Sequence, residues 1–275
     1  MRVRIPAVLD RPTPTTGHRV LTVAHRGASW HAPENTLAAV RAAVALGVDM
    51  VEVDVQRTRD GALVVMHDAT LLRTTDVRSR YPGRAPWSLS ELTFAELRGL
   101  DAGGWFSPAH AGEQVPTLAE VLAVLRGTGT GLLLELKRPD LHPGVAADLA
   151  AELAAHHRAP GPGVDVVVQS FDVPAMKELK TRLPMVPVGL LGRPAVANLA
   201  ALATWADQVN PSHLAADAAY VRAVRAHGMQ CFVWTVDRVP TLRRALRLGV
   251  DGIITNRPDR LAALGPIAAA ALRSP

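Results

Sequence analysis

Cysteine is nearly absent from this chain of 275 residues, which carries a single one, Cys231. One cysteine excludes internal disulfide bonds and metal sites built from several thiolates. Because Cys231 lies in an apolar, strand-like run, we expect a buried and unreactive thiol.

Long apolar runs are missing as well. No window of about 18 uninterrupted apolar residues exists, so the sequence predicts no membrane-spanning helix. Residues 1–6 are followed by Pro12, Pro14 and several threonines rather than by an apolar stretch, which argues against a signal peptide. These features favour a cytoplasmic protein without stable membrane insertion.

Basic clusters interleaved with aromatic residues are also absent, and aromatic residues make up only 4% of the chain. The net charge is +5, and most of the basic residues are arginines scattered along predicted helices. This pattern is typical of a solvated surface and predicts no binding of nucleic acid. The oligomeric state is not indicated by the sequence.

The chain does contain a repeated alternation of extended and helical segments, and 48% of its residues are hydrophobic. We predict strands at residues 20–24, 50–55, 131–136, 164–168, 186–191, 208–210, 230–236 and 252–255. Such alternation favours a (β/α)8 barrel, or TIM barrel, formed by residues 1–275 as one domain. An open doubly wound sheet is the alternative, but no G-x-G-x-x-G turn follows the first strand.

Two local features complete this prediction. A first helix is expected at residues 36–46, with Asn35 as its N-cap. The rhythm breaks at residues of about 70–115, which are rich in Arg, Thr, Gly and Pro and contain one short helical piece near residues 90–97. We interpret this segment, which follows the second strand and its extension at residues 62–66, as a short insertion rather than a second domain.

Acidic side chains occur in predicted strands where a barrel core should be apolar. Glu52 and Asp54 are two residues apart, so they lie on the same face of a strand, and Glu135 adds a third carboxylate from the next strand. Carboxylates this close repel unless a cation lies between them. Three carboxylates suit one hard divalent cation, Mg²⁺ or Ca²⁺. From spacing alone, two exposed acids on an edge strand remain the alternative.

Two histidines, His25 and His67, follow the first strand and the extended run after the second. Hydrolysis of a phosphodiester deprotonates a nucleophile and protonates a leaving alkoxide, and imidazoles titrate near neutral pH. Either histidine alone is typical of a hydrogen-bonded structural residue. Together, beside a carboxylate cluster, they indicate a catalytic acid–base pair.

Positive charge is expected at the same rim from Arg26 and Lys137, which suit the binding of an anionic phosphodiester. Lys137 is two residues beyond Glu135, so both side chains point to one side; the alternative is a surface lysine with its ammonium in water. Trp234 ends its strand and could contact a bound substrate, or could be a core tryptophan.

The order and spacing of these residues resemble the glycerophosphodiester phosphodiesterase family. The similarity covers nearly the whole chain from residue 20 to residue 264. It is carried by HRG at 25–27, PENT at 33–36, EVDV at 52–55, TRDG at 58–61, VVMHD at 64–68, LRTT at 72–75, WF at 105–106, VPTL at 115–118, LELK at 134–137, QSF at 169–171, VWTV at 233–236 and GVDGIITN at 249–256.

The resemblance implies a TIM barrel with a short insertion, and one divalent cation on Glu52, Asp54 and Glu135. It also implies His25 and His67 as acid–base residues, with Arg26 and Lys137 on the phosphate. The expected reaction is metal-dependent hydrolysis of a glycerophosphodiester to sn-glycerol 3-phosphate and an alcohol.

Two alternatives stay open from the sequence. The first is a lysophospholipase D-like phosphodiesterase with an acyl groove formed by aromatic residues of the insertion, namely Trp87, Phe94, Trp105 and Phe106. We expect these four side chains instead to pack the insertion onto the barrel. The second alternative is a barrel that binds a phosphorylated metabolite without turning it over.

Overall fold

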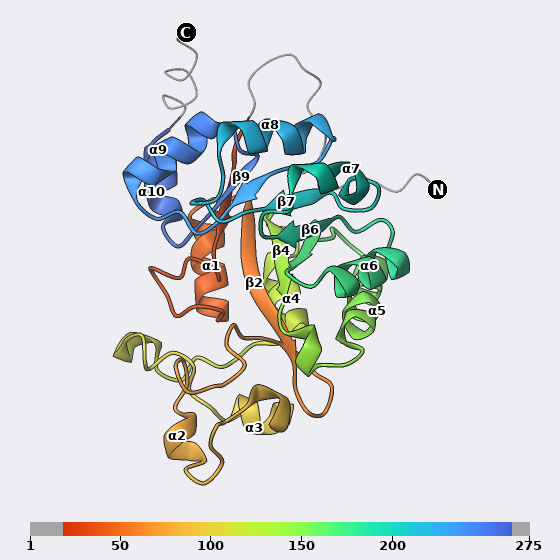
Figure 1. Cartoon of the computed structure of the whole chain (residues 1–275). Coiled ribbons are helices and arrows are strands. Elements are labelled where there is room, and N and C mark those ends of the chain that lie inside the picture. Colours follow the sequence, from red (N-terminus) through yellow and green to blue (C-terminus); the bar gives the residue numbers. More distant parts are fainter. Residues whose placement is uncertain (1–18, 266–275) are drawn as a thin grey trace.

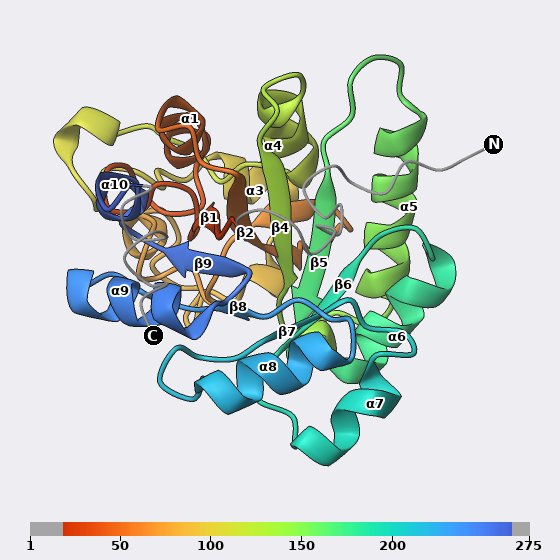
Figure 2. The same ribbon diagram turned by 90° about the horizontal axis from the view of Figure 1, so that it is seen from above.

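The computed structural model of the protein describes residues 19–265. Figures 1 and 2 show strands arranged around a central axis with helices on the outside. The strands are β1 (Leu21–Ala24), β2 (Met50–Arg57), β3 (Leu63–Val65), β4 (Gly131–Leu136), β5 (Val166–Ser170), β6 (Val188–Leu191), β7 (Gln208–Asn210), β8 (Phe232–Val233) and β9 (Gly252–Thr255). The helices are α1 (Leu37–Ala45), α2 (Val77–Arg80), α3 (Phe94–Arg98), α4 (Leu118–Leu125), α5 (Val145–Arg158), α6 (Val173–Arg182), α7 (Leu199–Leu202), α8 (Ala218–Ala226), α9 (Val239–Leu248) and α10 (Pro258–Ala263).

The strands form a nearly closed parallel barrel in the order β7-β6-β5-β4-β2-β1-β9-β8. Parallel bridges between Gln208 and Gln230 and between Ser212 and Trp234 join β7 to the β8 segment, and so bring the two ends of the sheet together. β3 lies outside the ring as an antiparallel partner of β2. The predicted (β/α)8 barrel is thereby confirmed.

The two faces of β2 explain how the barrel presents polar groups. Val51, Val53 and Val55 belong to the large apolar core between the sheet and its helices. Met50 belongs to a separate cluster with Val23, Leu133, Val167, Phe232 and Ile254, contributed by different strands. Because side chains alternate along a strand, Glu52 and Asp54 share the face of Met50. An apolar plug therefore fills one level of the barrel interior, and polar side chains follow it toward the ends of the strands.

Helix boundaries follow local capping chemistry. Thr117 and Glu120 form a reciprocal capping box at the start of α4, and Gly249, with φ +70°, ends α9. At α1 the N-cap is Thr36, whose hydroxyl accepts a hydrogen bond from the Ala39 N–H. The prediction that Asn35 caps this helix was wrong, because its side chain is engaged by β2 instead.

Other boundaries also differ from the prediction. The strand expected at residues 164–168 begins and ends two residues later, and the long strand expected at residues 230–236 is reduced to Phe232–Val233. The helical piece expected near residues 90–97 is two short helices, a 3-10 turn at Leu89–Glu91 followed by α3.

The insertion after the second strand forms a group of short helices, which includes α2 and α3 and lies beyond the end of β2 at the bottom of Figure 1. It has an apolar core with β3, to which Trp87 and Leu97 contribute and against which Phe94 packs. Trp105 is 43% exposed and contacts Phe106 edge to face. The insertion aromatics thus pack largely within the insertion.

Within residues 19–265, no helix combines the length and the apolar character needed to cross a bilayer. The N-terminal residues on which the expectation of no signal peptide depends lie outside the described residues.

Gly252 offers a test of how tightly the barrel interior is filled. A Cβ atom added at Gly252 would lie 2.6 Å from the ring of Phe232, a residue of the apolar plug. At Gly99, an added Cβ would lie 3.5 Å from the Glu96 carbonyl oxygen, an ordinary van der Waals distance.

We expect Gly252→Ala to lower the free energy of unfolding by about 1–3 kcal/mol, because overpacking a filled core forces its neighbours to shift. Gly99→Ala, the same change without the clash, should alter the free energy of unfolding by less than about 1 kcal/mol. Urea denaturation of both variants measures the difference. Equal stabilities would show that the interior has room for an extra methyl group.

Candidate active site

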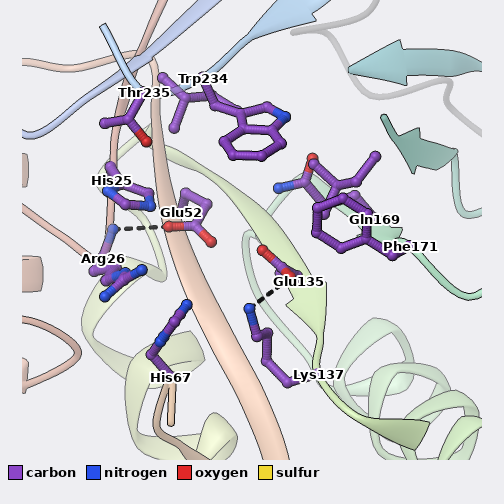
Figure 3. A pocket seen from close by; sticks show the side chains of 12 residues that line it. His25, Arg26, Glu52, His67, Glu135, Lys137, Gln169, Phe171, Trp234 and Thr235 are labelled. Carbon is purple, nitrogen blue, oxygen red and sulfur yellow. Dashed lines mark hydrogen bonds and ion pairs between the residues drawn. The ribbon is translucent and has the colours of Figure 1, made fainter. Parts of the chain in front are cut away.

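A cavity with a volume of about 480 Å³, including its open mouth, lies where the ends of the barrel strands meet. Figure 3 shows His25, Arg26 and His67 on one side of two carboxylates, with Gln169 and Phe171 on the other. The lining residues are His25, Arg26, Glu52, His67, Glu135, Lys137, Gln169, Phe171, Leu191, Trp234, Thr235 and Ile254. The cavity therefore brings together most of the residues that the sequence nominated.

Three carboxylates converge in or beside this cavity. Glu52, Asp54 and Glu135 each offer an oxygen, and these oxygens lie within 4.8 Å of one another. Glu52 and Asp54 are only 1% exposed. The alternative of exposed acids on an edge strand is thus wrong, because β2 lies inside the sheet between β1 and β4.

The crowding of these carboxylates disfavours their charged forms. Burial, followed by the charges of Asp54 and Glu135, raises the pKa of Glu52 well above its ordinary value. Burial and the charge of Asp54 likewise raise the pKa of Glu135 to about 7. Like charges about 5 Å apart repel by roughly 3 kcal/mol at an effective dielectric constant of about 20. Positive charge must compensate if all three are to stay ionised.

Part of that positive charge comes from Lys137 and Arg26. The Lys137 Nζ lies 2.8 Å from Glu135 Oε1 and 3.7 Å from Asp54 Oδ1, so Lys137 is not the solvated surface lysine of the alternative interpretation. The Arg26 guanidinium contacts Asp54 at 3.4 Å and Glu34 at 2.8 Å. Its backbone N–H donates to Glu52 Oε2 at 2.8 Å, and its left-handed φ of 57° is part of this turn.

The carboxylate oxygens also pass a test of fit for a cation. Among the described residues, Glu52 Oε1 and Asp54 Oδ1 are buried and accept no hydrogen bond. Buried oxygens that lack a donor are costly, and a hard divalent cation is the partner that such a cluster accommodates. The donor set is all oxygen, which suits Mg²⁺ or Ca²⁺.

His25 follows β1 and is held through one ring nitrogen. Its Nδ1 lies 2.7 Å from Asn256 Oδ1, and Asn256 in turn donates from Nδ2 to Asp237 at 2.8 Å. Burial, followed by the positive charge of Arg26, lowers the pKa of His25 to about 4. The neutral imidazole is therefore the form present at neutral pH.

His67 has an anionic partner instead. Its Nδ1 lies 2.6 Å from Asp68 Oδ1, and Arg73 donates to the other oxygen of Asp68 at 2.6 Å. Burial alone would raise the pKa of Asp68, but the hydrogen bonds from Arg73 and His67 lower it to about 2. Arg73 also donates to both oxygens of Glu34. An ionic chain thus runs from His67 through Arg73 and Glu34 to Arg26.

Two buried amides hold Asp54 and the His67 turn in place. The sequence gave Gln56 no role, and it favoured a helix cap for Asn35 over a place in the site. The Asn35 side chain donates to Asp54 Oδ2 at 2.8 Å and accepts from the Asp54 N–H at 3.2 Å. Gln56 donates to the carbonyl groups of Met66, His67 and Asp68, and so fixes the turn that carries His67. The signal for Gln56 was available, because it continues the alternation of Glu52 and Asp54.

Aromatic residues form the opposite wall of the cavity. Trp234 is partly buried, and its Nε1–H donates to the Asn210 carbonyl group at 2.8 Å. Phe171, which is 59% exposed, contacts Trp234 edge to face with ring centroids 5.8 Å apart. Trp234 thus lines the cavity and also packs against the apolar plug. Phe171 joins it in the wall, although the sequence gave Phe171 no role of its own.

One known protein family matches this chain over most of its length. The family model described as "Glycerophosphoryl diester phosphodiesterase family" matches residues 25–260, which include every site residue discussed above. The chain belongs to this family. Membership confirms the resemblance that the sequence motifs carried and the expectation of an enzyme.

Relatives in this family align over most of their length. A glycerophosphodiester phosphodiesterase from Bacillus subtilis is 36% identical over 260 residues, covering 88% of this chain and 85% of that protein. One from Caldanaerobacter subterraneus is 34% identical, covering 88% and 96%.

Solved structures of phosphodiesterases share the fold of this chain. An Oleispira antarctica phosphodiesterase, described in complex with the product sn-glycerol-3-phosphate, superposes with a TM-score of 0.79 at 28% identity, covering 88% of this chain and 95% of that one. A glycerophosphodiester phosphodiesterase from Agrobacterium tumefaciens gives a TM-score of 0.69 at 30% identity, covering 89% and 100%.

The raised pKa of Glu135 predicts a pH-dependent stability of the metal-free protein. A carboxyl group whose pKa is higher in the folded state stabilises that state below its unfolded pKa, and this stabilisation is lost as pH rises through the folded value. We therefore expect ionisation of Glu135 to lower the free energy of unfolding by about 1–3 kcal/mol between pH 4.5 and pH 7. His25, whose pKa is lower in the folded state, acts in the opposite direction over this range, so the contribution of Glu135 is measured as a difference between variants. Urea denaturation across this pH range, in the presence of a chelator, measures the free energy of unfolding.

Glu135→Gln removes this contribution, so between pH 4.5 and pH 7 its free energy of unfolding should rise by about 1–3 kcal/mol relative to that of the unchanged protein. Glu178→Gln makes the same change in an exposed ion pair with Arg182 and should show the pH dependence of the unchanged protein. A slope equal in Glu135→Gln and in the unchanged protein would contradict the assignment.

Proposed function

We propose that this protein hydrolyses glycerophosphodiesters to sn-glycerol 3-phosphate and an alcohol, using one divalent cation, Mg²⁺ or Ca²⁺. The observation that carries the proposal is that two histidines, buried carboxylates and two cationic side chains meet in one cavity. The relative described with bound sn-glycerol-3-phosphate supports the nature of the product.

Glu52, Asp54 and Glu135 would hold the cation, which supplies positive charge to the phosphate and lowers the pKa of the attacking hydroxyl group. Arg26 and Lys137 add positive charge from this chain, and both already lie against the carboxylates. Their charge opposes the negative charge that grows on the phosphate oxygens in the transition state. Trp234 would contact the glycerol moiety from the opposite wall.

The different partners of the histidines suggest different roles in moving protons. His25 is neutral and hydrogen-bonded to an amide, so its Nε2 is suited to take the proton of the attacking hydroxyl group. His67 has the Asp68 carboxylate at Nδ1, which orients the ring and leaves Nε2 as the atom that transfers a proton to the leaving alcohol. As the phosphorus–oxygen bond to the leaving alcohol breaks, His67 would protonate that oxygen. The attacking oxygen comes either from water or first from the neighbouring hydroxyl group of the glycerol moiety. In the second case a cyclic phosphate forms as the alcohol leaves, and water then opens it to sn-glycerol 3-phosphate.

The two alternative functions have less support. None of Trp87, Phe94, Trp105 and Phe106 lines the cavity, so the acyl groove expected for a lysophospholipase D-like activity has no basis in these side chains. A binding protein without turnover has no need of two histidines with separate partners. The cytoplasmic location, the single domain and the absence of nucleic-acid binding stay predictions.

Metal dependence gives the first test. Because buried carboxylates need a cation to hold the phosphate, we expect EDTA to abolish release of glycerol 3-phosphate from glycerophosphocholine, and Mg²⁺ or Ca²⁺ to restore it. A coupled assay for glycerol 3-phosphate measures the release. Glu52→Gln should lose restoration, whereas Glu178→Gln, an exposed surface change, should keep it.

Two results would count against this proposal. Undiminished release after exhaustive chelation would exclude an essential metal. Turnover of a lysophospholipid far above that of glycerophosphocholine would favour the lysophospholipase D-like alternative.

The histidines give the second test. His25→Ala and His67→Ala should each lower kcat by at least about 100-fold, the usual contribution of a general acid or base, while calorimetry still detects cation binding. A substrate with a p-nitrophenol leaving group needs no protonation of that group. Such a substrate should rescue His67→Ala but not His25→Ala.

His227→Ala removes an exposed histidine on the outside of the barrel and serves as the control. Turnover of glycerophosphocholine at the normal rate by either active-site variant would remove that histidine from the mechanism. Rescue of His25→Ala instead of His67→Ala would exchange the two roles.

A further inference from the structure

Asn256 and His25 occupy equivalent positions at the ends of neighbouring strands. β1 and β9 pair in parallel with Ala24 opposite Thr255, and the His25 N–H donates to the Thr255 carbonyl group at 2.9 Å. The two side chains that follow meet directly, with His25 Nδ1 2.7 Å from Asn256 Oδ1. The rigid barrel wall therefore sets this contact.

The orientation of the Asn256 amide follows from its other partners. Asp237 accepts hydrogen bonds from the Asn256 Nδ2 at 2.8 Å and from the Asn256 N–H at 2.8 Å. A carboxylate can only accept, so the NH2 group must face Asp237, and the carbonyl oxygen must face His25. Ser29 donates its hydroxyl to the same oxygen at 2.8 Å, which is consistent with this orientation.

We propose that Asp237 and Asn256 are a positioning pair that fixes the tautomer of His25, with hydrogen on Nδ1 and a free electron pair on Nε2. An amide oxygen accepts a hydrogen bond and cannot donate one, so Nδ1 must carry the hydrogen. The contribution to catalysis rests on the proposed function, in which Nε2 takes the proton of the attacking hydroxyl group. The tautomer itself does not depend on that function.

Other charges face the His25 ring but do not set its tautomer. Arg26 follows it in the chain, Asp54 faces it from β2, and Glu34 faces it from the segment before α1. They act on the imidazole through space, whereas the hydrogen bond at Nδ1 goes to Asn256. Changes at Asp237 therefore alter the tautomer while leaving these charges in place.

Asp237→Asn is the decisive variant. Thr255 Oγ1 and the Asn256 N–H both donate to Asp237 Oδ1, so a carbonyl oxygen should stay there and the new NH2 group should take the place of Oδ2. Two NH2 groups would then face each other. The Asn256 amide should turn over and present its NH2 group to His25 Nδ1, which moves the ring hydrogen to Nε2.

The tautomer can be read directly from the nitrogen-15 shifts of histidine side chains in the resting protein, without metal or substrate. The His25 signals are identified by their loss in His25→Gln. We expect hydrogen on Nδ1 in the unchanged protein and on Nε2 in Asp237→Asn. With glycerophosphocholine, kcat should fall by about 100-fold in Asp237→Asn with little change in KM, because a misplaced hydrogen removes the base.

A double variant, Asp237→Asn with Asn256→Asp, exchanges the two groups. The carboxylate at position 256 accepts from both the new amide and His25 Nδ1, so the original tautomer should return and kcat should recover to within about tenfold of the unchanged protein. The carboxylate also favours the protonated imidazole and raises the pKa of His25. The acidic limb of the kcat/KM profile should consequently move to higher pH.

Asp259→Asn is the matched control, because Asp259 lies three residues beyond Asn256 and binds Arg257 and His31 instead of Asn256. It should retain both the tautomer and the turnover. Hydrogen remaining on Nδ1 in Asp237→Asn, or a kcat there close to that of the control, would overturn the positioning role. Absence of turnover in the unchanged protein would instead refute the proposed function, while the tautomer measurement would still decide the pairing.

Discussion

Mutual repulsion among three buried carboxylates is the constraint on which the rest of this site depends. Oxygens of Glu52, Asp54 and Glu135 lie within 4.8 Å of one another inside the barrel, next to the apolar plug. Burial and proximity raise the pKa of Glu52 and Glu135, so the charged cluster is costly unless cations offset it. Lys137 and Arg26 offset part of this charge, and the two carboxylate oxygens without hydrogen-bond donors mark where a divalent cation fits.

The barrel supports this cluster by separating its interior into levels. An apolar plug that includes Met50 and Phe232 occupies one level, and the polar side chains follow one step further along the same strands. Because side chains alternate between the two faces of a strand, residues two positions apart lie next to each other on the same face. Glu52, Asp54 and Gln56 therefore extend from the plug toward the turn that carries His67.

Partners outside the cavity give the two histidines different properties. His25 is tied to the uncharged amide of Asn256 at the β1–β9 junction, whereas His67 is tied to the carboxylate of Asp68. Arg73 donates a hydrogen bond to Asp68 and another to Glu34. Because Arg26 also donates to Glu34, these contacts connect the start of the insertion with Arg26. The insertion, with its own apolar core, thus adjoins the active site through an ionic chain as well as through the backbone.

The sequence by itself determined the barrel and the chemical types at its mouth, because alternation and helix caps are local and because the spacing of Glu52 and Asp54 places them on one face. It also nominated His25, His67, Arg26, Lys137 and Trp234, all of which line the cavity. Only the tertiary structure decided which side chains these residues bind through hydrogen bonds. Asn35 was predicted to be a helix cap, and nothing in the sequence paired Asp237 with Asn256, nineteen positions further along the chain. Hydrogen bonds between side chains depend on which strands become neighbours and in what register, and the closing of the barrel sets that register across more than two hundred residues, as between His25 and Asn256.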